Sequence, residues 1–146
     1  MEMEPELPLR ITVADPPPAV AFAVQRGRDG LLPPTRRTAD EIVFDFTVRA
    51  GERGGRPNFL GEFAQGTPAD RFVYVNSGTF AGQAGSRWER RAKVKLSSIT
   101  REMIGAALAD PGAVLEARFH GIGRDGGPAC ATVPLLDGGW RVVRGG

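Results

Sequence analysis

The run WERRAKVKL, residues 88–96, carries four cations in the alternating pattern of a β-strand. Because side chains in a strand point alternately to its two faces, Arg90 shares a face with the apolar residues of the run. The opposite face carries the other cations of the run, which are Arg91, Lys93 and Lys95. These three are typical of a solvated face or edge of a sheet, where lysine discourages pairing with other molecules.

Arg90 is the cation in this run whose place has chemical consequences. A guanidinium among apolar side chains must pair with an acid, contact a ligand or reach solvent at the strand end. Asp45 and Glu116 are candidate partners, because each interrupts an otherwise apolar strand. A guanidinium can also form two parallel hydrogen bonds with a carboxylate or phosphate, so a ligand held by Arg90 would be an anion. The three interpretations stay open.

A glycine-rich segment, residues 51–70, precedes this run and contains five glycines and two prolines. Loops of this length are uncommon in compact domains and are often functional. We therefore expect residues 57–68 and the cationic run to frame a site for an anionic small molecule or an acidic protein surface. The expected ligand contacts are Arg71, Arg90 and Arg91 for charge, and Phe59, Phe63 and Tyr74 for apolar contact. Tyr74 could equally lie in the core with its hydroxyl satisfied.

His120 and Cys130 are the only histidine and the only cysteine of the chain. A neutral imidazole can act as a general base, so a small enzyme that uses His120 with Glu116 or Asp45 is the second hypothesis. Cys130 has no second cysteine for a disulfide, a redox pair or a metal site. We therefore expect no metal and no cofactor, and a non-enzymatic binding module is the first hypothesis.

Charge is distributed unevenly along the chain. The net charge is +2, whereas residues 87–101 contain six cations and one acid, a local charge of +5. Proteins that bind single-stranded nucleic acids combine such a basic surface with exposed aromatic rings. The aromatic residues here alternate in the pattern of a core instead, so nucleic-acid binding is the third hypothesis and nucleic acid is not an expected partner.

The composition is that of a globular domain. The chain has 146 residues, of which 41% are apolar and 25% are charged, so it can bury a hydrophobic core. No apolar run approaches the ~18 residues that span a bilayer. The acidic start MEMEPELPL lacks the features of a secretory signal or transit peptide. We therefore expect a cytoplasmic protein without membrane contact, and the sequence leaves its oligomeric state open.

Periodicity predicts a mainly β (α+β) single domain over residues 9–144, after a flexible acidic leader over residues 1–8. Helical spacing of apolar residues predicts one short helix over about 98–109, with Ser97 or Ser98 as its N-cap. About eight strands and one helix in one domain indicate a β-barrel or a β-sandwich. The segments with the pattern of strands are 8–15, 19–24, 41–49, 71–78, 88–96, 113–122, 129–135 and 140–143.

Three of the connecting segments have a definite expected form. Residues 33–40, PPTRRTAD, predict a loop, and the glycine-rich segment predicts a long loop with a short strand near 59–63. Asn76, Ser77 and Gly78 have the composition of a turn, which would end the strand over 71–78.

Several motifs together resemble those of a known protein family. They are VAFAVQRGRDG (20–30), VFDFTVR (43–49), PNFLGEFAQGTPADRFVYVNSG (57–78), WERRAKVKLSSI (88–99) and GRDGGPACATVPL (123–135). From about Arg10 to Val143, the chain resembles a bacterial, largely actinobacterial, family known as a domain of unknown function. The resemblance implies a bacterial, cytoplasmic, single-domain protein, and it implies no activity and no catalytic residue.

Overall fold

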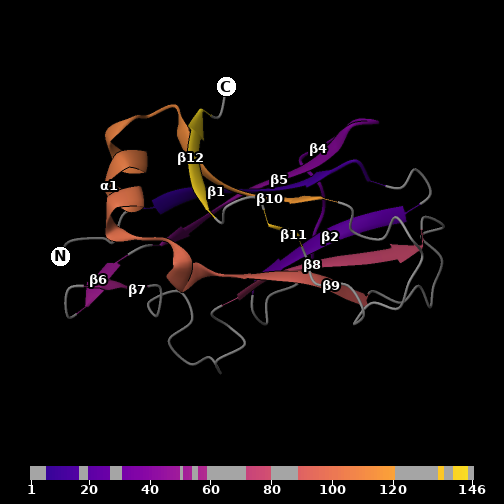
Figure 1. Ribbon diagram of the computed structural model, residues 1–146, viewed down its shortest axis with the longest axis horizontal. Helices are drawn as coiled ribbons and strands as arrows, with labels where there is room; N and C mark the ends of the chain where they lie inside the picture. Colours follow the sequence, from indigo (N-terminus) through magenta and orange to yellow (C-terminus); the bar gives the residue numbers. More distant parts are fainter. Residues whose placement is uncertain are drawn as a thin grey trace.

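The protein consists mainly of β-strands, with a single α-helix in the part of the chain that the structure describes (Figure 1). The computed structural model describes residues 6–16, 20–26, 31–49, 51–53, 56–58, 72–79, 89–120, 135–136 and 140–144. These residues form a six-stranded sheet, a four-stranded sheet and a small hairpin of β6 (Gly51–Arg53) and β7 (Arg56–Asn58). The mainly β fold with one helix is thus confirmed, and the described strands form no closed barrel.

The six-stranded sheet is centred on β1 (Glu6–Ala14), which has a long neighbour on each side. β5 (Glu41–Arg49) runs antiparallel to β1 along its whole length, whereas β10 (Ala113–His120) runs parallel to it. Parallel strands cannot be joined by a tight turn, and here most of the chain lies between them. The other strands of this sheet are short: β4 (Arg36–Arg37) pairs with β5, and β11 (Leu135–Leu136) and β12 (Arg141–Arg144) pair with β10.

The four-stranded sheet has the order β3–β2–β8–β9 and is antiparallel throughout. β2 (Val20–Arg26) and β8 (Phe72–Thr79) occupy its centre. β3 (Leu31–Leu32) and β9 (Glu89–Lys95) form its two edges. In Figure 1 this sheet lies below the larger one, and β9 is its lowest strand.

One hydrophobic core receives side chains from both sheets. Strand alternation directs every second residue of β1 into it, namely Leu7, Leu9, Ile11 and Val13. The smaller sheet contributes Phe22 and Val24 from β2 and Val73 and Val75 from β8. Burying a large apolar side chain contributes about 1.5–3 kcal/mol, so this shared cluster is what holds the two sheets together.

A buried tryptophan adds a polar link to this core. Trp140 directly precedes β12 of the larger sheet and is almost fully buried. Its indole Nε1 donates a hydrogen bond of 2.9 Å to the carbonyl oxygen of Lys95, the last residue of β9 in the smaller sheet. Trp140 therefore connects the two sheets through both packing and a directed bond.

The helix α1 (Arg101–Ala109) begins after Thr100, whose Oγ1 accepts a hydrogen bond of 3.1 Å from the backbone N–H of Met103. That bond satisfies one of the N–H groups that the start of a helix leaves without a partner. Ala107 is buried against the strands. No helix among the described residues is long and apolar enough to cross a lipid bilayer.

The predicted caps of this helix, Ser97 and Ser98, are wrong. Both residues lie in a 3-10 turn, Leu96–Ser98, that precedes the helix. The next residue, Ile99, has an extended backbone and is fully buried in the core. Burial of Ile99 holds the chain in an extended conformation at that residue. The helix therefore begins at Arg101, two residues later than a cap at Ser98 would place its start.

The turn predicted at residues 76–78 is also wrong, because β8 continues through Thr79. Asn76 and Ser77 pair with β2 on one side and with β9 on the other, and both side chains are buried. The ladder on both sides overrides the local preference of these residues for a turn. The loop predicted over 33–40 contains β4, whereas the bounds predicted for β5 agree with the structure.

The expected leader over residues 1–8 and the expected short strand near 59–63 remain to be compared with the structure. β1 begins at Glu6, within the range assigned to the acidic leader. The short strand expected near 59–63 lies outside the described residues, so it stays a prediction.

We expect Thr100→Ala to lower the free energy of unfolding by about 1 kcal/mol, because the mutation removes the side-chain oxygen that caps α1. Urea unfolding followed by circular dichroism measures this loss. Ser98→Ala is the matched control, since the exposed Ser98 precedes the helix start, and it should change stability by less than about 0.5 kcal/mol. Equal effects of the two substitutions would show that Thr100 does not act as the cap.

Candidate functional site

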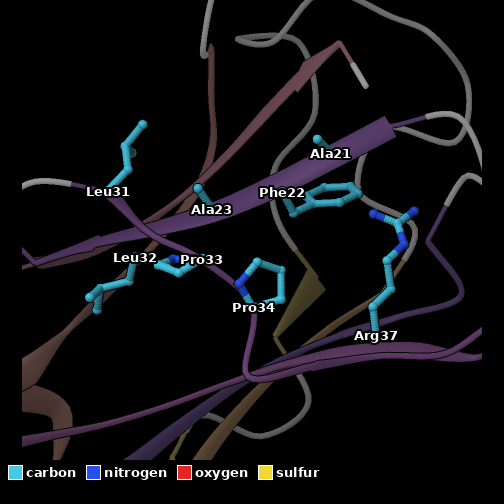
Figure 2. A pocket seen from close by; sticks show the side chains of 8 residues that line it. All are labelled: Ala21, Phe22, Ala23, Leu31, Leu32, Pro33, Pro34 and Arg37. Carbon is cyan, nitrogen blue, oxygen red and sulfur yellow. The ribbon is translucent and has the colours of Figure 1, made fainter. Parts of the chain in front are cut away.

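An apolar cavity of about 430 Å³ lies at one edge of the four-stranded sheet (Figure 2). β2 contributes residues 21–23 to its wall, β3 contributes residues 31–32, and the segment that follows contributes residues 33–34 and, in β4, Arg37. Seven of the eight lining residues are apolar. The cavity thus has the composition of a small-molecule site, in which apolar walls surround a small number of polar groups.

Two prolines explain why a cavity forms at this place. β3 pairs with β2 only through Leu31 and Leu32. Pro33 and Pro34 follow, and proline has no backbone N–H with which to extend a ladder. The chain therefore leaves β2 and crosses to the other sheet, where β4 pairs with β5. The space between β2 and the departing segment is the cavity.

Thr35 fixes the departing segment against the larger sheet. Its backbone N–H donates a hydrogen bond of 2.8 Å to the carbonyl oxygen of Val43. Its Oγ1 accepts a bond of 2.9 Å from the backbone N–H of Asp45. These bonds join the segment to β5, so one wall of the cavity is attached to each sheet.

Arg37 is the charged group of the cavity wall. In β4 it lies opposite Ile42, which is fully buried on the inner face of the sheet. Directly opposed residues share a face, so Arg37 is also directed inward. Figure 2 shows its side chain pointing from β4 toward β2, on the side where the Phe22 ring lies. Arg36, one residue earlier, is exposed and forms a 3.3 Å ion pair with Glu41.

A second polar cluster lies on the outer face of the larger sheet. Arg10 of β1 lies opposite Asp45 of β5 and Glu116 of β10. Its Nε and Nη2 donate bonds of 2.7 and 3.3 Å to the two carboxylate oxygens of Asp45. The hydrogen bond with Asp45 raises the pKa of Arg10, partial burial opposes the rise, and the charges of Asp45, Glu116 and Glu41 add to it.

Asp45 and Glu116, the two acids that interrupt apolar strands, both belong to this cluster. Asp45 and Glu116 both flank Arg10 in the larger sheet, whereas Arg90 belongs to β9 of the smaller sheet. Glu116 additionally accepts a 2.8 Å hydrogen bond from the hydroxyl of the fully buried Thr12. The cluster is thus a structural ion-pair network, and the partner of the Arg90 side chain stays a prediction.

The structure does not bring His120 and its predicted carboxylate partners into contact. His120 and Glu116 lie on the same face of β10, four residues apart, which places their Cα atoms about 13 Å apart in a strand. Asp45 of β5 forms its ion pair with Arg10 of β1. Among the described residues no group of three or more histidine, cysteine, aspartate or glutamate side chains could hold a metal ion. The hypothesis of an enzyme that uses His120 with Glu116 or Asp45 stays a prediction.

The predicted ligand contacts have no common site in the described part of the chain. Phe59, Phe63 and Arg71 lie outside it, and of Arg90 and Arg91 only the backbone is described, as part of β9. Tyr74 is buried, with its ring stacked on that of Phe72 at 6.0 Å. The cavity lies at the opposite edge of the same sheet, beside β3.

The backbone register also changes the interpretation of the cationic run. Val75 of β8 pairs with Ala92, but the next residue, Asn76, pairs with Arg90. The register therefore shifts by one residue at this point, and the alternation that holds for Ala92 and Val94 does not extend regularly to Arg90. A bulge of this kind has no reliable sequence signal.

The sequence does contain a signal for the cavity, in LLPPTRR at residues 31–37. Two apolar residues before two prolines indicate a strand that must end abruptly, and the cations that follow supply charge. The composition of residues 33–40 by itself predicts only a loop. The inward direction of Arg37 depends on its pairing with Ile42 of β5, a register that the motif itself does not specify.

Comparison with known proteins matches residues 7–143 to DUF5990, a family of unknown function. The match covers most of the chain. No curated protein matches significantly, and neither does any solved structure.

We expect Arg10→Gln to lower the free energy of unfolding by about 1–2 kcal/mol, since it leaves two adjacent carboxylates without their cation. This loss of stability is smaller than that expected for a buried ion pair, because the Asp45 side chain is 36% exposed. Arg36→Gln is the control, and its exposed ion pair should contribute less than about 0.5 kcal/mol. Chemical denaturation at pH 7 measures both, and an Arg10→Gln protein as stable as the parent would contradict the assignment.

Proposed function

We propose that this protein, which belongs to the DUF5990 family, is a binding module for a small amphipathic anion. The apolar part of the ligand would occupy the cavity between β2 and residues 31–37, and its carboxylate would bind Arg37. The observation that carries the proposal is an apolar cavity of about 430 Å³ with one inward guanidinium in its wall.

The size and lining of the cavity support a ligand with a short hydrocarbon chain. Small-molecule sites commonly have volumes of ~300–1,000 Å³. Each methylene group removed from water contributes about 0.8 kcal/mol, so the seven carbons of octanoate beyond its carboxylate would gain roughly 5–6 kcal/mol. Loss of translational and rotational freedom offsets much of this gain. A dissociation constant between about 10 µM and 1 mM is therefore expected for octanoate.

Arg37 supplies the selectivity for an anion. A charge-assisted hydrogen bond contributes about 1.5–3 kcal/mol, roughly twice as much as a neutral one. A guanidinium can also hold both oxygens of a carboxylate, which an alcohol cannot match. A carboxylate should therefore bind more tightly than an alcohol of the same chain length, and this difference in affinity should depend on Arg37.

The lining of the cavity favours binding over catalysis. General acid–base or nucleophilic chemistry needs a side chain that can accept a proton or attack a substrate. The lining residues that the structure describes are seven apolar residues and one arginine, and arginine stays protonated at any physiological pH. This composition supports the binding module over the enzyme hypothesis.

Isothermal titration with sodium octanoate, sodium decanoate and 1-octanol tests the proposal. We expect both carboxylates to bind with a stoichiometry of one and octanol to bind at least about tenfold more weakly, because only the carboxylates form the charge-assisted bond. Arg37→Gln should remove this difference. Ala21→Phe, which fills part of the cavity wall, should weaken all three ligands.

The adjacent arginine provides the matched control for this experiment. Arg36→Gln removes the same charge from the same short strand, but from its exposed side. It should leave the titrations unchanged, whereas nonspecific attraction of anions would make the two substitutions equivalent. Absence of binding of both carboxylates up to 10 mM, roughly ten times the weakest constant expected for octanoate, would contradict the proposal.

A further inference from the structure

The far edge of the four-stranded sheet has the features of an interaction surface. β9 (Glu89–Lys95) is the last strand of this sheet, and no other described strand pairs with its outer side (Figure 1). An edge strand presents alternate N–H and C=O groups to an additional strand. The Lys95 carbonyl already accepts the Trp140 indole bond, so the stretch of β9 that no described strand pairs on this side is residues 89–94.

The side chains along this edge are cationic. Lys93 and Lys95 are exposed, and within the described part of the chain neither forms an ion pair with an acid. Their ammonium groups lie 4.7 and 5.7 Å from the centre of the Phe72 ring. Residues 87–101 carry a local charge of +5, so this edge lies in the most basic part of the sequence.

We propose that the outer edge of β9 binds an extended acidic segment of a partner protein, which adds to the sheet as a further strand. Backbone hydrogen bonds would supply affinity, and glutamate or aspartate side chains opposite Lys93 and Lys95 would select the partner. Lysines on an edge also repel a second copy of the same edge, so the charge that prevents self-association leaves acidic strands as the favoured occupants.

The aromatic residues beside this edge favour a peptide over a nucleic acid. Binding of single strands relies on open ring faces on which bases stack. The Phe72 ring is approached by both lysine ammonium groups and is stacked on Tyr74, which is itself buried. This surface does not depend on the proposed cavity, which lies beside β3 at the other edge of the sheet.

The test uses the full chain and an acetylated eight-residue peptide of alternating glutamate and valine. Titration followed by ¹⁵N–¹H correlation spectra should show shifts concentrated in β9. Lys93→Glu with Lys95→Glu should weaken binding at least about tenfold, because attraction becomes repulsion. The charge-matched control is Arg36→Glu with Arg144→Glu, two exposed positions in the larger sheet, and it should change binding less than about threefold. Equal losses in both double variants would overturn the proposal.

Two modified ligands separate strand addition from simple charge attraction. One peptide is methylated on the backbone nitrogens of all its valines, and the other on those of all its glutamates. Each modification removes the N–H donors from one edge of the extended peptide. One of the two must lose binding if the peptide adds as a strand, and full binding by both would overturn the model. Decauridylate is the third probe: tighter binding of this RNA than of the peptide, lost in the Lys93→Glu with Lys95→Glu protein, would replace the peptide by a nucleic acid.

Discussion

The pairing of β1 with two unlike neighbours is the constraint on which the rest of the fold depends. β5 pairs with β1 in the antiparallel direction, and β10, which comes much later in the sequence, pairs with β1 in the parallel direction. Because the register of both neighbours is set by β1, the inner faces of all three strands align their apolar residues toward one core. The same registers bring Asp45 and Glu116 to Arg10 on the outer face, so one pairing scheme organises both the core and the ion-pair network.

The two sheets are held by apolar burial, but the space between them is shaped by backbone chemistry. Pro33 and Pro34 cannot donate the hydrogen bonds that would extend β3 along β2. The chain crosses to the larger sheet instead, where Thr35 bonds to β5. A cavity therefore forms at one edge of the smaller sheet, while lysines occupy the other edge. The two edges of one sheet thus have different chemistry, and each can serve a different binding role.

Three arginines illustrate how position in the fold decides what a cation does. Arg10 lies between two acids and stabilises the sheet. Arg36 is exposed and forms a weak surface pair, whereas Arg37, its neighbour in the chain, is directed inward to the cavity. All three share the same side-chain chemistry. Only the strand face and the cross-strand neighbours distinguish a structural role from a candidate binding role.

Alternation of apolar and polar residues was sufficient to predict the mainly β fold, the single helix and the bounds of β5, because burial on one face is a local, periodic signal. The turn predicted at Asn76 and the cap predicted at Ser98 failed, because ladder pairing on both sides and the burial of Ile99 override local preference. The prolines of LLPPTRR indicate where β3 ends, but they do not predict the cavity, which forms only because β2 and β5 belong to different sheets. Composition and periodicity follow from the chain itself, whereas register and the meeting of distant strands depend on long-range pairing that single residues do not encode.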